Sequence, residues 1–374
     1  MTSALFSPLS FGPMTVPNRI AIPPMCQYSA SDGTPGDWHT QHWMTLAMSG
    51  AGMITVEATG VERHGRITHG CLGLYSDDNE AAIASRLAAA RRVAPKGTRF
   101  GIQLAHAGRK ASSHLPWRGG RPLGPHGDPW PTSAPSAVSY WPDGPLPDAL
   151  DEPGIDRVVS HFAMAAERAA RAGFDFVEVH GAHGYLIHSF LSPIANRRTD
   201  HWGGSLENRM RLARAVTRAV RAVLPDRVAV GARLSVTDWV EDGFSPDEAV
   251  MVARALNEDG AVYICASAGG VRADIQVPQT PSYLVPFAER IRREAGIVTR
   301  AVGLIDEPLQ AEAIIAEGKA DLVALGRATL ADPRWPWRAA SVLGEELRPV
   351  DQYARSAGMI HKWAPPAQNA GAAA

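Results

Sequence analysis

Eight short runs rich in Val, Ile and Leu alternate along the chain with stretches that have the spacing of amphipathic helices. The runs are Arg19–Ile22, Met53–Glu57, Arg99–Leu104, Phe174–His180, Val228–Leu234, Val262–Ala266, Ile297–Arg300 and Leu322–Leu325. Short Val-, Ile- and Leu-rich runs are typical of parallel strands that helices cover. Eight strand–helix units predict an α/β fold, a (β/α)8 TIM barrel, as a single domain over residues 1–364. The segment 365–374 is predicted to be a disordered tail.

The ends of several helices are also marked in the sequence. Ser245 and the following Pro-Asp-Glu predict a helix start with a capping box, and Gly260 stands where a helix-ending glycine belongs. A helix over Leu206–Leu224 is predicted after Ser205, because apolar residues recur there every three or four positions. Gly173 is expected to end, in the same way as Gly260, the helix that comes before the predicted strand at Phe174.

A doubly wound sheet is the alternative architecture. Its dinucleotide signature is missing, because Gly50-Ala51-Gly52 lacks a third glycine and precedes a strand instead of following one. One connection is too long for an ordinary barrel loop: residues 105–153 hold ten of the 29 prolines and the tryptophans Trp117, Trp130 and Trp141. We expect a functional excursion over one barrel face after the third strand, with a surface loop outside the chemistry as the alternative.

Composition excludes several classes of protein. The 374 residues carry 37 Lys and Arg against 38 Asp and Glu, so no basic footprint indicates a nucleic-acid or membrane partner. Three cysteines, Cys26, Cys71 and Cys265, cannot form a disulfide framework or a four-cysteine metal site. Neither a signal peptide nor an apolar run of about 20 residues is evident. These features predict a cytoplasmic location.

The fourth predicted strand ends in the most informative stretch. His180 stands at its carboxyl end, and His183 and Tyr185 follow between glycines. Barrel enzymes place their active sites at this end of the strands, and two imidazoles with a phenol could polarise a carbonyl oxygen and deliver a proton. Buried structural histidines are the alternative. A metal site stays open on this motif, because Glu178 could point to the same side as His180.

Three further groups lie at predicted strand ends. Pro23-Pro24-Met25-Cys26 and Tyr28 follow the first strand, where the Cys26 thiol could touch a cofactor or substrate. Gly303 follows the seventh strand and Gly326-Arg327 the eighth, which in barrels is a frequent phosphate site. Gln103 and Arg233 end strands inside the barrel, where a polar ligand could partner them.

Taken together, these stretches resemble one family. NRIAIPPMCQYS, TVEATGV, FGIQLAHAGRKA, FVEVHGAHGYLIHSFLSPIANRRTDHWGGSLENRMRL, ARLSVTDW, AVGLI and DLVALGRATLADP run in family order from residue 18 to 333. The chain is similar to the old yellow enzyme family of FMN-dependent ene-reductases. It is closest to the thermophilic-like subclass, which includes bacterial xenobiotic reductases and NADPH dehydrogenases.

The resemblance implies a role for each matching residue. The flavin would be held by Pro23, Pro24, Met25, Cys26, Ala58, Gln103, Arg233, Gly303, Gly326 and Arg327. His180 and His183 would bind the substrate carbonyl oxygen, Tyr185 would donate the proton, and Tyr28 would line the substrate pocket. The Cys26 thiol would tune the redox potential of the flavin.

The implied reaction has two halves: NADPH or NADH reduces FMN, and an α,β-unsaturated carbonyl compound then accepts the hydride. No metal is implied. Family analogy implies a homodimer or homotetramer, in which Arg355 of Gln352-Tyr353-Ala354-Arg355 could reach a neighbouring site. The aromatic residue that often follows is replaced by Ser356-Ala357, and Trp363 could substitute for it. A metal-dependent barrel hydrolase and a non-catalytic flavin-binding protein are the alternative functions.

Overall fold

Eight parallel strands close into a barrel in a computed structural model that describes residues 3–346 and 348–367. In barrel order they are β10 (Tyr263–Ser267), β11 (Val298–Ala301), β12 (Leu322–Ala324), β3 (Ile20–Ile22), β4 (Met53–Gly60), β5 (Arg99–Ala105), β8 (Phe176–Gly181) and β9 (Ala229–Ser235). Each overlaps one predicted run, so the predicted (β/α)8 barrel is confirmed. Of the predicted tail, residues 368–374 lie outside the described residues.

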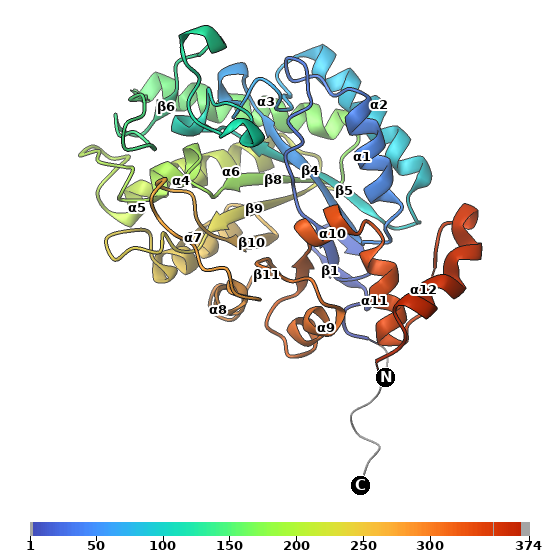
Figure 1. Ribbon diagram of the computed structural model, residues 1–374. Coiled ribbons are helices and arrows are strands. Elements are labelled where there is room, and N and C mark those ends of the chain that lie inside the picture. The colour runs from blue at the N-terminus through green and yellow to red at the C-terminus, as the bar shows by residue number, and fades with distance from the viewer. Residues whose placement is uncertain (1–2, 347, 368–374) are drawn as a thin grey trace.

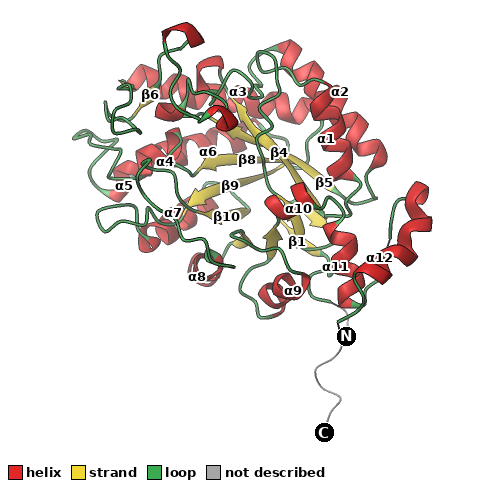
Figure 2. Ribbon diagram, in the orientation of Figure 1, coloured by secondary structure: helices red, strands yellow, loops and turns green. Residues whose placement is uncertain are grey.

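Helices surround the barrel (Figure 1, Figure 2). They are α1 (Asp37–Ala47), α2 (Asp77–Val93), α3 (Glu152–Ala172), α4 (Leu186–Leu191), α5 (Leu206–Arg209), α6 (Arg211–Val223), α7 (Pro246–Glu258), α8 (Val285–Ala295), α9 (Pro308–Ala316), α10 (Arg327–Ala331), α11 (Trp335–Leu343) and α12 (Ala357–Trp363). Among the described residues, none of these helices is both long and apolar enough to cross a bilayer.

The helix ends follow the sequence signals, with one exception. Ser245 and Glu248 form the capping box of α7, and Gly173 ends α3 at a φ of +99°. The predicted single helix over Leu206–Leu224 is instead two helices, α5 and α6. They meet at Met210, which ends α5 and caps α6 with a φ of −84° and a ψ of −5°.

A short hairpin that the sequence analysis missed packs at the amino-terminal end of the barrel. Strands β1 (Leu9–Phe11) and β2 (Met14–Val16) pair antiparallel, and the Phe11 ring meets the Tyr263 ring edge-on at 6.0 Å. Tyr263 begins β10, so Phe11 covers the apolar interior from that side. The opposite, carboxyl-terminal end is left for ligands.

Aromatic rings that lie opposite glycines fill part of the barrel interior. A Cβ at Gly101 would lie 2.0 Å from the Phe176 ring, and a Cβ at Gly231 would lie 2.0 Å from the Tyr263 ring. Gly101 pairs with Phe176, and two residues further along the same strands Gln103 pairs with Glu178. The aromatic layer therefore supports a polar layer directly above it, nearer the carboxyl ends of the strands.

The long connection after β5 is an excursion, as predicted. It holds the 3₁₀ turns η2 (Gly108–Lys110), η3 (Pro116–Arg118) and η4 (Pro125–Gly127) and the strand pair β6 (Ser133–Ala134) and β7 (Asp148–Ala149). In Figure 1 it lies above the barrel, around the label β6. This segment therefore stands over the barrel, where it can form part of a site.

Candidate active site

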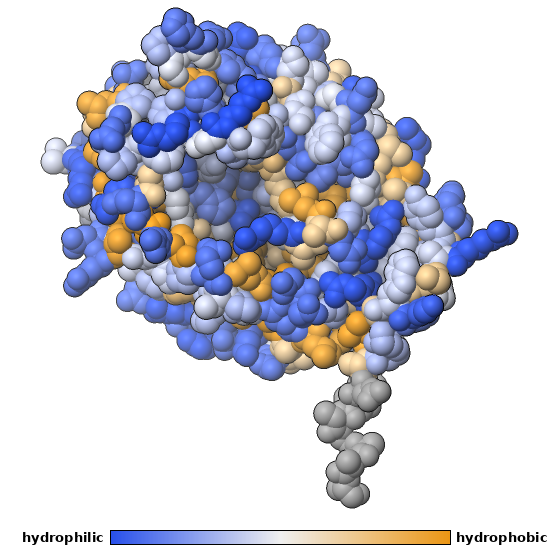
Figure 3. All heavy atoms as spheres, viewed as in Figure 1, coloured by the Kyte–Doolittle hydropathy of each residue, from blue (hydrophilic) through white to orange (hydrophobic). Residues whose placement is uncertain are grey.

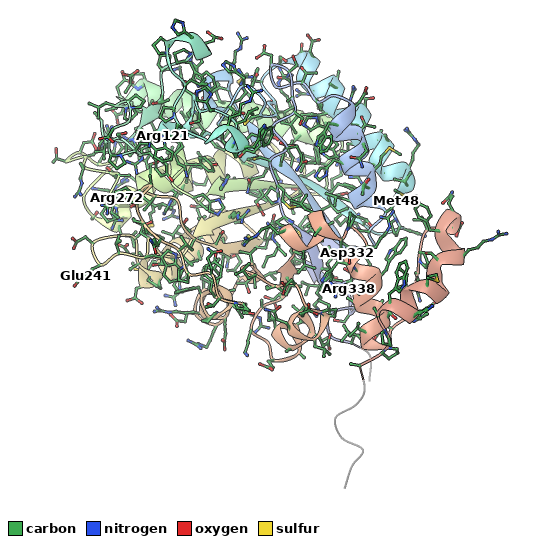
Figure 4. The ribbon with its side chains drawn as sticks, viewed as in Figure 1. Met48, Arg121, Glu241, Arg272, Asp332 and Arg338 are labelled. Atoms are coloured by element: carbon green, nitrogen blue, oxygen red, sulfur yellow. The ribbon has the colours of Figure 1, made fainter. Side chains whose placement is uncertain are left out.

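Many of the predicted site residues line one cavity of about 640 Å³ at the carboxyl ends of the barrel strands. They are Pro23, Pro24, Met25, His183, Arg233, Gly303, Gly326 and Arg327. Figure 3 shows a hollow in this face of the molecule. Asp332 and Arg338, which also line the cavity, lie beside each other near α10 and α11 (Figure 4).

The three candidate catalytic rings lie together. The centres of the His180 and His183 rings are 5.1 Å apart, and the Tyr185 ring is 5.0 Å from His180 and 6.4 Å from His183. Strand β8 places His180, and the turn from β8 to α4 places the other two. Two imidazoles and one phenol therefore converge on one region at the strand ends.

His183 has a left-handed backbone conformation, with a φ of +61°. A residue with a Cβ pays about 1–2 kcal/mol for this conformation, so neighbouring groups must hold it. Ser235 Oγ accepts the His183 N–H at 3.0 Å, and Lys110 Nζ donates to the His183 carbonyl at 2.7 Å. Lys110 was not among the predicted site residues.

A second residue that the sequence analysis missed, Ser267, connects two predicted ones. Its Oγ is hydrogen-bonded to His183 Nε2 at 2.8 Å and accepts a hydrogen bond from Arg233 at 3.2 Å. The buried Arg233 Nε has no partner in the described chain. A buried guanidinium nitrogen without an acceptor is costly, and this one belongs to a residue that lines the cavity.

The two histidines are neutral at physiological pH. Burial, and then the nearby Arg233 cation, hold the pKa of both His180 and His183 well below 6.5. The Ala182 N–H donates to His180 Nδ1 at 3.3 Å, so the proton of neutral His180 is on Nε2. His180 is thus a neutral hydrogen-bond donor.

The phenols and the thiol of the site are protonated. Burial raises the pKa of Tyr185 and of Cys26 well above their usual ranges, and also raises the pKa of Tyr28. The Cys26 thiol interacts with the Tyr28 hydroxyl, and Tyr28 has a left-handed φ of +51°. Each of these groups can give a proton but carries no charge of its own at neutral pH.

Glycines form the wall after β11 and β12. Gly303 has a φ of +113°, and a Cβ there would lie 3.1 Å from the Tyr283 ring. Gly326 lies against Pro23 and Met25, and Arg327 begins α10. Backbone and guanidinium N–H groups at this wall suit an anionic group such as a phosphate.

Gln103 and Glu178 lie in the polar layer below the cavity. Gln103 Nε2 donates to Glu178 at 2.8 Å, the Tyr263 hydroxyl donates to Glu178 at 2.8 Å, and Arg300 pairs with the same carboxylate. Glu178 is therefore engaged inside the barrel and is not a metal ligand beside His180. Nowhere in residues 3–346 and 348–367 do three His, Cys, Asp or Glu side chains form a group suited to a metal ion.

Besides Gln103, six predicted residues do not line the main cavity: Cys26, Tyr28, Ala58, His180, Tyr185 and Arg355. Ala58 follows a bulge in β4 and lines a small space together with Cys71 and Tyr185. Arg355 is exposed in the 3₁₀ turn η5 (Asp351–Ser356) and is not among the residues that line the cavity. The structure of one chain does not bring Arg355 to the other site residues.

Comparison with known proteins identifies the family of the chain. The model of the NADH:flavin oxidoreductase / NADH oxidase family matches residues 4–346. The NADPH dehydrogenase of Geobacillus thermodenitrificans is 41% identical over 357 residues, which are 95% of this chain and 99% of that protein. That of Halalkalibacterium halodurans is 40% identical over 358 residues, again 95% of this chain and 99% of the relative.

Solved structures are similar along nearly the whole chain. Morphinone reductase is 30% identical with a TM-score of 0.74, over 94% of this chain and 92% of that one. A 2-naphthoyl-CoA reductase is 22% identical with a TM-score of 0.80, over 93% of this chain and 53% of that one, and shows the fold alone. The chain therefore belongs to the NADH:flavin oxidoreductase / NADH oxidase family and is an FMN-dependent oxidoreductase that uses NADPH or NADH.

Proposed function

We propose that the protein is an ene-reductase, which reduces the carbon–carbon double bond of α,β-unsaturated carbonyl compounds such as enones, enals and maleimides. The observation that carries the proposal is the convergence of two neutral imidazoles and one protonated phenol beside the flavin cavity. A protein that only binds flavin has no need of this group. A metal-dependent hydrolase is disfavoured because Glu178 is paired with Arg300.

The residues of the cavity fit FMN. Arg233 offers a buried Nε that lacks an acceptor, and Gly303, Gly326 and Arg327 offer N–H donors for the phosphate. Pro23, Pro24, Met25, Cys26 and Ala58 would line the ring system, and Gln103 would bond its polar edge. When bound, FMN supplies the hydride that it takes from NADPH or NADH.

His180 and His183 would bind the carbonyl oxygen of the substrate. As neutral donors they withdraw electron density from the double bond and stabilise the negative charge that develops on the oxygen, without requiring a counter-ion. Ser267 fixes the orientation of the His183 ring, and Arg233 fixes Ser267. The oxygen is thereby held in one position, and the β carbon becomes the electrophile.

Tyr185 would give its phenolic proton to the α carbon. The raised pKa of Tyr185 keeps the proton on the phenol until a carbanion-like α carbon needs it. Tyr28 would line the substrate pocket from the segment that follows the carboxyl end of β3, with its hydroxyl against Cys26.

An anaerobic titration tests the proposal. The visible spectrum of the purified holoenzyme is recorded, NADPH is added, and 2-cyclohexenone follows. Loss of the yellow colour and its return on adding the enone is the expected result. If the yellow colour is lost and does not return, the ene-reductase assignment is overturned, whereas the assignment as a flavin oxidoreductase stands.

Two features that the sequence predicts concern the assembly and its location. We propose a homodimer or homotetramer in the cytoplasm, in which the exposed Arg355 or Trp363 of one subunit reaches the site of another. Light scattering of the purified protein, with an Arg355→Ala variant assayed for activity, tests the assembly. A monomer with unchanged activity in the variant would remove this proposal.

A further inference from the structure

A second cavity, of about 620 Å³, opens beside Tyr28, between the segment after β3, the loop after β4 and the excursion. Six basic side chains line it: Arg63, Arg66, His69, His114, Arg118 and His126. Among the described residues that line it, Asp32 is the one carboxylate. The cavity shares no lining residue with the cavity assigned to FMN.

The charges of this second cavity are not balanced. Asp32 accepts from Arg63 at 2.8 Å and from the Tyr75 hydroxyl at 3.1 Å, and its carboxylate lies 3.3 Å from Arg66. Arg118 is exposed and forms no ion pair with any described residue. Three guanidinium groups against one carboxylate leave a net charge of about +2 before any histidine is protonated, which suits a doubly charged phosphate.

The basic wall is fixed in place by its own contacts. Arg66 donates to the carbonyls of Arg63 at 3.0 Å and His69 at 3.4 Å, and its guanidinium lies 5.8 Å from the centre of the Trp130 ring. His69 Nε2 is hydrogen-bonded to the Gly127 carbonyl at 3.1 Å. These contacts order Arg66 and His69 before a ligand binds, so less side-chain entropy would be lost at these two residues.

The position of the cavity relates it to the hydride donor. Tyr28 lines it, and the Tyr28 hydroxyl meets Cys26 at the flavin site. Arg66 also lines the small space that Ala58 and Tyr185 share. Through Tyr28 and Arg66 the cavity adjoins the groups around Cys26 and Tyr185, so a dinucleotide with its nicotinamide at these groups could extend into it.

NADPH and NADH differ by one phosphate on the 2′-oxygen of the adenosine ribose. We propose that Arg63 and Arg118 bind this 2′-phosphate, with Arg66 as the fixed cation behind them, and that the enzyme therefore prefers NADPH to NADH. The inference concerns the hydride donor, and it stands independently of the enone proposed above as the acceptor. Arg63 and Arg118 are the residues to substitute in the test, because both are exposed. Arg66 is buried and holds the loop, so it is left unchanged.

Binding of nucleotide fragments to the holoenzyme gives the first measurement. Isothermal titration with adenosine 2′,5′-bisphosphate is compared with adenosine 5′-monophosphate for the wild type and the Arg63→Gln/Arg118→Gln double variant. We expect the double variant to bind the bisphosphate roughly 10- to 100-fold more weakly, with monophosphate binding unchanged. The matched control is Arg121→Gln, an exposed arginine of the same excursion that stacks on Trp141 and does not line the cavity (Figure 4).

The reductive half-reaction gives the second measurement, and needs no enone. Stopped-flow reduction of FMN should show a raised Kd for NADPH in the double variant, an unchanged Kd for NADH, and an unchanged limiting rate with both. Equal weakening for NADPH and NADH would overturn the assignment, because the pyrophosphate is common to both. Unchanged binding of NADPH and of the bisphosphate would also overturn it.

Discussion

The amino group of Lys110 donates to the carbonyl oxygen of His183 at 2.7 Å, so that a side chain from the excursion fixes the turn that carries His183. The same Nζ donates to the Gly270 carbonyl at 3.0 Å and lies 4.9 Å from the centre of the Tyr185 ring. Lys110 thereby ties the loops after β5, β8 and β10 together. Under the proposed function, Lys110 would position the groups that act on the substrate.

Replacing Lys110 with methionine removes the two hydrogen bonds but keeps an apolar stem of similar length. We expect enone-driven oxidation of the flavin to slow about 10- to 100-fold, because His183 and Tyr185 lose their fixed separation. Stopped-flow measurement of both half-reactions checks this. If reduction by NADPH slows as much as oxidation does, Lys110 has a general structural role instead.

The charge of Lys110 also makes stability depend on pH. Burial, and then the Arg109 cation, lower the Lys110 pKa from 10.5 to about 7. Between these values the unfolded chain binds more protons than the folded one, so folding becomes more favourable as the pH rises from about 7 to 10.5. Urea denaturation should show the wild type gaining stability relative to Lys110→Met over this window. A constant difference would contradict the shifted pKa.

Tyr185→Phe removes the proposed proton donor and leaves the ring. The oxidative half-reaction with an enone should slow about 10²-fold or more, which is typical of a lost general acid, whereas reduction by NADPH should stay nearly unchanged. Single-turnover kinetics separate the two halves. Equal slowing of both would argue against proton donation by Tyr185.

Cys26→Ala tests whether the thiol tunes the flavin. Its pKa is raised by burial and then by Cys71 and Glu57, so a neutral S–H group is removed and no charge changes. A shift of the flavin reduction potential with turnover retained is the expected result, measured by spectroelectrochemistry. Complete loss of activity with FMN still bound would show that the thiol does more than tune.

Glu178→Gln should destabilise the barrel strongly. It leaves the Arg300 guanidinium buried without a counter-charge, and breaking one side of a buried ion pair typically costs about 3–5 kcal/mol. The double variant Glu178→Gln/Arg300→Met should recover part of the loss. Urea denaturation checks both, and a double variant less stable than the single one would contradict the pairing.

The barrel was predictable because each strand lies in a short run rich in Val, Ile and Leu, and helical spacing separates the runs. The two-residue spacing of Glu178 and His180 also allowed both side chains to point to the same side of the strand. The fourth predicted run begins at Phe174, whereas β8 begins at Phe176. Phe174 is buried like the residues of the strand, although it stands two residues before the strand begins. Strands β1 and β2, of three residues each, are too short to produce a recognisable alternation.

The partners of the site residues were harder to predict than the residues themselves. Glu178 meets Arg300 and Lys110 meets His183 across 122 and 73 positions, and no local pattern encodes such pairs. Ser267 was within reach of sequence reasoning. It stands one residue beyond the predicted run Val262–Ala266, at a strand end where functional side chains gather.

The contacts of Gly101 with Phe176 and of Gly231 with Tyr263 bear on how relatives of this protein diverge. A methyl group at either glycine would overlap an aromatic ring, so neither position can enlarge unless its neighbour becomes smaller in the same lineage. Each pair should therefore covary among homologues. Glu178 lies between these rings and the flavin cavity. A change of side-chain size in either pair would therefore shift the polar layer at the bottom of the cavity that would hold the cofactor.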